Sequence, residues 1–422
     1  MRLLLYVPYN RPGGVERVII SLVTELSKQI DQVILVASPQ LLKRFQGQIP
    51  NNDKIIYQPF TLINYSYKNK LLGLINKLSS FSKKVSLTFL NSLQESYYQN
   101  LVFEQIIEKY DVTHCLYAIA NKTKPPKLKV PLFTISHDIF WHFSPLTYDQ
   151  KYKLKYDQSF LQWLKKADGI ISVSEKTKAD IIQLFPDFKS KVKTISNAGF
   201  IAPEKDLTKD RSNETKETIF LFPSSFGIYK DHLTLIKAGV ILAKKKKHHF
   251  KVVFIGKETD KIIQVDINLS QQNSTQEYQT HIAQLQNIYK ENQDIIDQHF
   301  IGLGYCSDQE LEEWYKKSSC VIFPSRYEGF GLAISEAIVR GIPVIASDLN
   351  VFKEQVKLYQ CPDRVSFFER QNEEQLAEKI SAFIDNPLTP LEQDEIDYYR
   401  NLWNWEKVAT EYINVLSSSD NT

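Results

Sequence analysis

Cysteine is scarce in this chain, its net charge is small, and no long apolar run stands near its start. The four cysteines, Cys115, Cys306, Cys320 and Cys361, are scattered over 422 residues without C-x-x-C spacing. A disulfide framework or a zinc site is therefore not expected, and a reducing cytoplasm is the simpler setting. The formal net charge of +3 is too small to indicate nucleic-acid binding.

The first apolar run, Leu3–Val7, is far too short for the core of a signal peptide or for a membrane span. It predicts a buried first strand instead. We therefore expect a protein that stays on the cytoplasmic side of any membrane it meets.

The length and the spacing of the apolar runs predict two α/β domains. At 422 residues the chain exceeds what one ordinary core holds. Short apolar runs alternate with helical patterns along most of it, which indicates parallel sheets with helical crossovers. The expected strands are Leu3–Val7, Gln32–Ala37, Val112–Tyr117, Pro131–Ser136, Gly169–Val173 and Val192–Ile195 in the first half, and Thr218–Phe222, Phe250–Ile255, Phe300–Leu303, Ser319–Pro324 and Pro343–Ala346 in the second.

A polar, highly charged stretch at 203–217 separates the two series and indicates a linker. The expected fold class is α/β, with one Rossmann-like doubly wound domain at 1–202 and a second at 218–399, facing a central cleft. A C-terminal helix at about 400–422 is expected to pack back on the first domain.

The most informative segment is the junction Ser325–Ala337, which joins an apolar strand to a predicted helix that runs on toward Gly341. A strand, a turn with two glycines and a helix is how α/β proteins present backbone N–H groups to phosphate. Glu328 stands in the turn and Glu336 in the helix, so two carboxylates accompany this anion cradle. The segment predicts a site for a nucleotide-linked, polyhydroxylated ligand.

Other strand ends carry further candidate contacts. Gly13 and Gly14 open a predicted helix, where they allow backbone to approach a ligand or simply form a tight turn. His137 follows a strand directly, and it either contacts a ligand or settles into packing. Lys230 can neutralise a diphosphate as a point charge, or it is one solvated lysine among many. Gly256 closes a strand and would leave room for a base or a ribose.

The run Asn64–Leu93 is basic and amphipathic. Such a stretch can lie on an anionic membrane surface. It can equally be a solvated helix face whose other side packs on the core, and both interpretations stay open. Its lysines are Lys68, Lys70, Lys77, Lys83 and Lys84, and it contains no acidic residue.

Taken together, these segments resemble the family-four retaining glycosyltransferases of the two-Rossmann GT-B architecture. The family's Glu-x7-Glu signature corresponds to Glu328 and Glu336, with Gly-Phe-Gly-Leu directly after the first Glu. The resemblance covers nearly the whole chain. It takes in Gly13–Gly14, His137-Asp138, Asp168–Ser174, Ser196–Gly199 and Lys230.

The resemblance also implies a role for each site residue. Lys230 would hold the donor diphosphate, Glu328 the sugar hydroxyls and Glu336 the ribose, while Gly14 and His137 face the donor. Backbone N–H groups after Glu328 would bind sugar and phosphate. The expected catalytic residues are thus His137, Lys230 and Glu328, and the expected donor-binding residues are Gly13, Gly14, Ser225, Gly256, Gly329, Phe330, Gly331, Leu332 and Glu336.

One departure concerns the diphosphate. The family usually carries an Arg five or six residues before the Lys, where this chain has Ser224 and Ser225. Bacterial members with a similar Pro-x-x-Phe-x-x-x-Lys-x-His pattern also lack this Arg, so inactivation does not follow from its absence.

The resemblance implies transfer of a hexose, with mannose favoured, from a nucleotide-diphosphate sugar to a glycan or lipid-linked saccharide in cell-surface polysaccharide synthesis. Anomeric configuration would be retained, and no metal or other cofactor is expected. The enzyme would be cytoplasmic, or peripheral at the inner face of the plasma membrane. Two alternatives stay open, a non-catalytic nucleotide-binding partner subunit of a transferase and a synthase-type transferase with a soluble acceptor.

Overall fold

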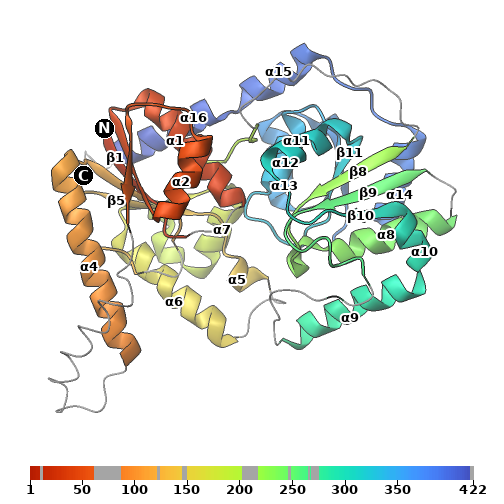
Figure 1. Cartoon of the computed structure of the whole chain (residues 1–422), viewed down its shortest axis with the longest axis horizontal. Helices are drawn as coiled ribbons and strands as arrows, with labels where there is room; N and C mark the ends of the chain where they lie inside the picture. Colours follow the sequence, from red (N-terminus) through yellow and green to blue (C-terminus); the bar gives the residue numbers. More distant parts are fainter. Residues whose placement is uncertain are drawn as a thin grey trace.

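The structure is a computed structural model, which describes residues 1–9, 13–60, 87–120, 124–144, 150–201, 217–245, 249–264, 267 and 275–418. Two α/β halves lie side by side and are joined at one end, where the chain passes between them (Figure 1). Each half has its own sheet with helices on both faces. We call them the N-terminal and the C-terminal half.

The sheet of the N-terminal half is entirely parallel, in the order β3-β2-β1-β4-β5-β6-β7. Its strands are buried apolar runs, as expected for a sheet that helices cover on both faces. They are β1 (Arg2–Tyr6), β2 (Gln32–Ala37), β3 (Ile55–Pro59), β4 (His114–Tyr117), β5 (Leu132–Ser136), β6 (Gly169–Ser172) and β7 (Val192–Thr194). The helices are α1 (Gly14–Gln29), α2 (Pro39–Gln48), α4 (Leu87–Tyr110), α5 (Phe140–Phe143), α6 (Gln150–Lys166), α7 (Glu175–Leu184) and η2 (Pro186–Lys191).

The sheet of the C-terminal half is also parallel, in the order β10-β9-β8-β11-β12-β13. Its strands are β8 (Thr218–Pro223), β9 (Phe250–Ile255), β10 (Phe300–Gly302), β11 (Cys320–Phe323), β12 (Val344–Ser347) and β13 (Val365–Phe368). Its helices are η3 (Ile228–Lys230), α8 (His232–Lys245), α9 (Gln276–Glu291), α10 (Gln293–His299), α11 (Asp308–Lys317), α12 (Leu332–Ile338), α13 (Asn350–Leu358), η4 (Pro362–Arg364) and α14 (Glu373–Asp385).

Both strand orders reverse direction at one point, between β1 and β4 in the first sheet and between β8 and β11 in the second. In open parallel sheets this reversal leaves a crevice at the carboxyl ends of the strands, where ligands bind. The expected α/β architecture of two doubly wound domains is therefore confirmed. The sequence pattern missed β3 and β13, which are edge strands with half-exposed residues.

The chain returns to the N-terminal half at its C-terminal end. The helix expected at about 400–422 corresponds to α16 (Trp405–Ser417), which Asn404 caps and which follows a separate helix, α15 (Gln393–Leu402). α16 packs against α1, and its buried side chains belong to the core of the N-terminal half. The Trp403 indole N–H lies 3.1 Å from the carbonyl oxygens of both Ser196 and Asn197, which fixes this return.

Two predicted segments fall mostly outside the described residues. These are the linker 203–217 and the basic run Asn64–Leu93. In the part of the chain that the structure describes, no helix combines the length and apolarity needed to cross a membrane.

Tyr412 tests the packing of α16. Its side chain is fully buried, and its hydroxyl has no hydrogen-bond partner in the structure. Because an unpartnered buried hydroxyl costs about 1–3 kcal/mol, Tyr412→Phe should leave the thermal unfolding midpoint unchanged or raise it. Tyr412→Ala should lower the stability by about 3–5 kcal/mol, as for other large-to-small core changes.

The matched control is Tyr398→Ala, at a residue that is 52% exposed on α15. It should change stability by less than about 1 kcal/mol. Equal destabilisation by the two alanine variants would contradict the packing of α16 described above.

Candidate functional site

The residues that the sequence analysis selected gather where the two sheets face each other. His137 follows β5, Gly256 follows β9, and Lys230 ends η3 in the loop after β8. Glu328 lies in the turn between β11 and α12. These positions are carboxyl ends of parallel strands, as the topology requires.

Lys230 and Glu328 form the central contact. Lys230 Nζ lies 2.6 Å from Glu328 Oε1, and both side chains are largely buried. Burial disfavours the charged lysine, but Glu328, Tyr229 and Asp138 together outweigh this effect, so the pKa of Lys230 is raised. The Ser325 hydroxyl donates to the same Glu328 oxygen at 2.7 Å, so the carboxylate is held from two directions.

A second ion pair lies directly beside the first in sequence. Arg326 Nη2 lies 2.6 Å from Oδ1 of the fully buried Asp231, and the Thr234 hydroxyl donates to Asp231 Oδ2 at 2.8 Å. The loops after β8 and β11 are thus joined by two ion pairs. The sequence did not single out Asp231 and Arg326, although Asp231 follows Lys230 directly and Arg326 stands two residues before Glu328.

Gly329 brings the backbones of the two halves close together. A Cβ atom placed on Gly329 would lie 1.8 Å from the His137 carbonyl oxygen, so only glycine fits there. The carbonyl of Gly329 accepts hydrogen bonds from the hydroxyls of Ser174 at 2.6 Å and Thr177 at 3.0 Å. Backbone of the C-terminal half is therefore held by side chains at the start of α7.

His137 and Asp138 have opposite pKa shifts. Burial lowers the pKa of His137 to about 4, which makes the ring neutral at pH 7, and its Nε2–H donates to the Ala118 carbonyl at 2.8 Å. Burial raises the pKa of Asp138 to about 6, and nearby Glu328 adds to this. Asp138 was quoted in the sequence analysis but not selected, and it is the second carboxyl beside Lys230.

The predicted phosphate cradle differs in one respect from expectation. α12 ends at Ile338, short of Gly341, and spans seven residues. Gly331 precedes it with φ +82°, and a Cβ there would lie 2.6 Å from Phe352. By comparison α1, which also begins at this interface, has sixteen residues.

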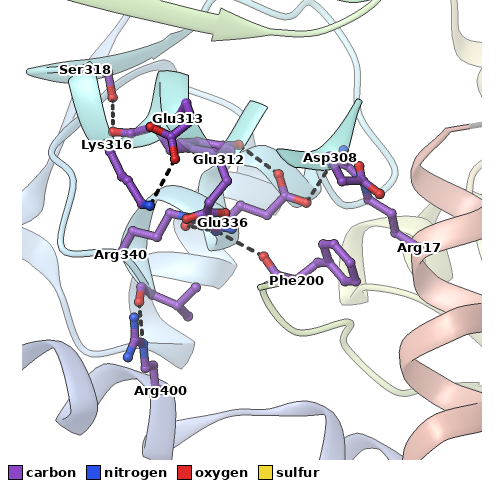
Figure 2. Close-up of polar contacts among 12 residues, drawn as sticks. Arg17, Phe200, Asp308, Glu312, Glu313, Lys316, Ser318, Glu336, Arg340 and Arg400 are labelled. Atoms are coloured by element: carbon purple, nitrogen blue, oxygen red, sulfur yellow. Dashed lines mark hydrogen bonds and ion pairs between the residues drawn. The ribbon is translucent and has the colours of Figure 1, made fainter. Parts of the chain in front are cut away.

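Glu336 is enclosed by protein groups (Figure 2). Arg17 Nη1 from α1 lies 3.2 Å from Oε1, and the Tyr315 hydroxyl donates to Oε2 at 2.7 Å. Arg17 also pairs with Asp308 on α11, and Arg340 pairs with Glu312. The adjoining cavity has a volume of only about 10 Å³, which is too small for a sugar ring. A ribose could reach Glu336 only if Arg17 moved away.

The remaining selected residues lie at contacts between loops or at the helix starts. A Cβ on Gly256 would lie 2.3 Å from the Ser225 backbone nitrogen, so its small size is needed for chain packing. The Ser225 hydroxyl accepts from the Lys257 N–H at 3.1 Å. Gly14 faces Leu332 across the interface, next to Gly13, and Phe330 is buried in the core of the N-terminal half. Among the described residues, no group of three or more His, Cys, Asp and Glu side chains could hold a metal ion.

This arrangement of two Rossmann-like halves with facing switch points defines the GT-B class of fold. The family model described as Glycosyltransferase Family 4 matches residues 12–198, and that described as Glycosyl transferases group 1 matches residues 204–401. The chain therefore belongs to the group 1 glycosyltransferases of family 4.

Curated relatives match the chain only in part. The O-antigen chain mannosyltransferase B of Escherichia coli is 33% identical over 120 residues, which are 26% of this chain and 28% of that protein. An uncharacterized glycosyltransferase of Methanocaldococcus jannaschii is 22% identical over 60% of this chain and 61% of its own length. The chain thus spans less than two thirds of either relative.

Solved structures match over the whole chain at low identity. Anabaena HepE, solved in complex with UDP-glucose, has a TM-score of 0.64 and 16% identity, with 99% of this chain and all of that chain covered. Staphylococcus aureus TarM has a TM-score of 0.66 and 13% identity at the same coverage. These likenesses establish the GT-B fold of the chain.

The shifted pKa values of His137 and Asp138 predict a change in the pH dependence of stability. Asp138 contributes stability that is lost as pH rises from its ordinary value of 3.8 through about 6. His137 contributes stability that is lost as pH falls from 6.5 through about 4. Asp138→Asn removes the first contribution, so its unfolding midpoint should rise with pH more steeply than that of the wild type over this range.

The measurement is the thermal unfolding midpoint of the wild type and the variant in a series of buffers from pH 4 to 7. The wild type and the variant share all other titrating groups, so the difference between their two curves reports the titration of Asp138. Parallel curves would show that Asp138 keeps an ordinary pKa in the folded protein.

Proposed function

We propose that this glycosyltransferase moves a hexose, with mannose favoured, from a nucleotide-diphosphate sugar to a glycan or lipid-linked saccharide acceptor in cell-surface polysaccharide synthesis. The observation that carries the proposal is the Lys230–Glu328 pair beyond the neighbouring carboxyl ends of β8 and β11. Lys230 would be the cation for a diphosphate and Glu328 the carboxylate for sugar hydroxyls, and the two side chains are in hydrogen-bond contact.

The chemistry of glycosyl transfer fits these groups. When the sugar–phosphate bond breaks, negative charge grows on the leaving diphosphate and positive charge on the anomeric carbon. Lys230 would stabilise the diphosphate, and Glu328 would orient sugar hydroxyls and favour the positive carbon. Such fixed electrostatic stabilisation is usually the largest contribution to catalysis.

Neutral His137 would face the donor without adding charge beside Lys230. We propose that the acceptor hydroxyl attacks on the face that the diphosphate leaves, so that the configuration is retained without a protein nucleophile. The new glycosidic bond forms as the sugar–phosphate bond breaks, and the acceptor proton leaves with the diphosphate. No metal takes part in this proposal, because Lys230 and backbone N–H groups would supply the positive charge.

The preference for mannose is supported by the names of partial relatives. Besides the Escherichia coli protein, the Salmonella typhimurium O-antigen chain mannosyltransferase RfbU is 39% identical over 82 residues, which are 18% of this chain and 23% of that protein. Both names also refer to the O-antigen, a cell-surface polysaccharide. Cytoplasmic location and association of Asn64–Leu93 with an anionic membrane stay predictions.

Enzyme assays distinguish the two alternative functions, a non-catalytic partner subunit and a synthase-type transferase. A non-catalytic partner subunit, which the Ser224–Ser225 departure favours, would bind nucleotide without turnover. A synthase-type enzyme would use a soluble acceptor, and a sucrose-phosphate synthase from Thermosynechococcus elongatus has the same fold at a TM-score of 0.64. Fold likeness alone does not choose between these readings.

The test begins with a thermal-shift screen of GDP-, UDP- and dTDP-sugars, because a ligand that binds the folded state raises its stability. The donor that binds is then supplied with membrane extract. Lys230→Ala and Glu328→Gln should each lower transfer by about 10²–10³-fold, as for other electrostatic contacts to the transition state.

The matched controls are Lys237→Ala and Glu373→Gln, which break another ion pair of the same half, with 3.1 Å between its charged atoms. They should retain transfer within about twofold, because a part-exposed pair contributes little. Full transfer by the Lys230 and Glu328 variants would refute the site. Nucleotide binding without transfer to any acceptor would favour the partner-subunit reading.

A further inference from the structure

Tyr327, the residue before Glu328, is a side chain of the C-terminal half that is buried in the N-terminal half. It is 8% exposed, although it belongs to the turn between β11 and α12. Its partners come from α5, from α7 and from the segment between β5 and α5. These elements lie on the side of the N-terminal half that faces the other half (Figure 1).

The hydroxyl of Tyr327 joins two chain segments of the N-terminal half. It accepts a hydrogen bond from the Ile139 N–H at 3.2 Å and donates to Asp180 Oδ2 at 3.0 Å. Asp180 is only 3% exposed. A buried carboxylate is costly unless hydrogen-bond donors or cations replace the water that it loses. Ile139 follows His137 and Asp138 directly, so the Tyr327 hydroxyl fixes the segment that carries both.

The ring of Tyr327 is also held. It stacks on Phe143 with a centroid distance of 6.3 Å and an interplanar angle of 11°. Lys176 Nζ lies 5.1 Å from the Tyr327 ring centroid and 5.3 Å from that of Phe143, and it pairs with Asp180. The cation therefore faces both rings and the carboxylate that holds the hydroxyl.

Tyr327 and Gly329 anchor Glu328 from both sides. Tyr327 is bound by Asp180 and Ile139, while the Gly329 carbonyl is bound by the hydroxyls at the start of α7. Glu328 itself pairs with Lys230 of its own half. Since both neighbours are bound to the N-terminal half, the position of Glu328 depends on contact between the halves.

We propose that Tyr327 is a positioning residue that places Glu328 for transfer only when the two halves are in contact. This inference rests on the proposed function for its kinetic part and goes beyond it, since Tyr327 would act through the position of Glu328. Separation of the halves breaks the bonds to Asp180 and Ile139 and releases one side of the Glu328 turn. The Tyr327 hydroxyl thereby links domain closure, which excludes water from the reaction, to the geometry of the carboxylate.

The main variant is Tyr327→Phe, which keeps the ring against Phe143 and Lys176 and removes the hydroxyl. Transfer kcat should fall about tenfold, which equals about 1.4 kcal/mol of transition-state stabilisation. The donor KM should stay within about twofold, because the donor binds mainly to the C-terminal half. The ratio of donor hydrolysis to transfer should rise, because contact between the halves limits water.

A matched control exists elsewhere between the halves. The Tyr359 hydroxyl, also buried, accepts the Gly199 N–H across the halves at 3.0 Å, and neither Tyr359 nor Gly199 belongs to the turn that carries Glu328. Tyr359→Phe removes an equivalent hydrogen bond and should leave kcat and the hydrolysis ratio within about twofold. Equal kinetic losses in the two variants, or unchanged kcat in Tyr327→Phe, would overturn the proposal.

A double variant gives a further readout. Asp180→Ala and Tyr327→Phe should not add in their effects on kcat, because both remove the same hydrogen bond. Additive losses would contradict a role through Asp180.

The structural part can be tested without any substrate. Spin labels at the exposed positions Gln158 on α6 and Asn287 on α9, in a Cys306→Ser background, report the separation of the halves. Tyr327→Phe should add a population at longer distance that the wild type lacks. This experiment still decides the role of Tyr327 if the wild type proves inactive as a transferase, whereas identical distance distributions would refute it.

Discussion

The contact of Gly329 with the end of β5 is the constraint on which the rest of the site depends. A side chain at Gly329 would overlap the His137 carbonyl, with a Cβ only 1.8 Å away. The missing side chain lets backbone meet backbone, and the hydroxyls of Ser174 and Thr177 then bind the Gly329 carbonyl. Glu328, one residue earlier, is brought by this contact close to Asp138 of the N-terminal half, and it pairs with Lys230 of its own half. The two halves thus complete one site.

The charged groups of this site are arranged for geometry more than for stability. The pairs Lys230–Glu328 and Arg326–Asp231 are mostly buried, and the desolvation of buried charges offsets much of their attraction. They join the loops after β8 and β11 at adjacent positions and are supported by Ser325 and Thr234. The proposed stabilisation of a leaving diphosphate requires charges that are held in place before the reaction begins.

Much of the fold can be predicted from the sequence, because strands that are buried on both faces are continuous apolar runs. For example, β9 has the same bounds as the strand predicted from its apolar run. The edge strands β3 and β13 escape this signal, since their residues are half exposed. Lys230 and Glu328 could be found because each follows a strand next to the reversal of strand order. Arg17, Asp180 and Tyr327 could not, since their partners lie more than a hundred residues away in the chain. Only the packing of the halves reveals them.

The central claim is the proposal that Lys230, beside Glu328, binds the diphosphate of a sugar donor. The most direct measurement is a crystal structure with the nucleoside diphosphate of the donor that binds. The account predicts phosphate oxygens within hydrogen-bond distance of Lys230 Nζ, with the nucleoside on the C-terminal half. A diphosphate bound elsewhere, with the Lys230–Glu328 pair undisturbed and remote from it, would contradict the account.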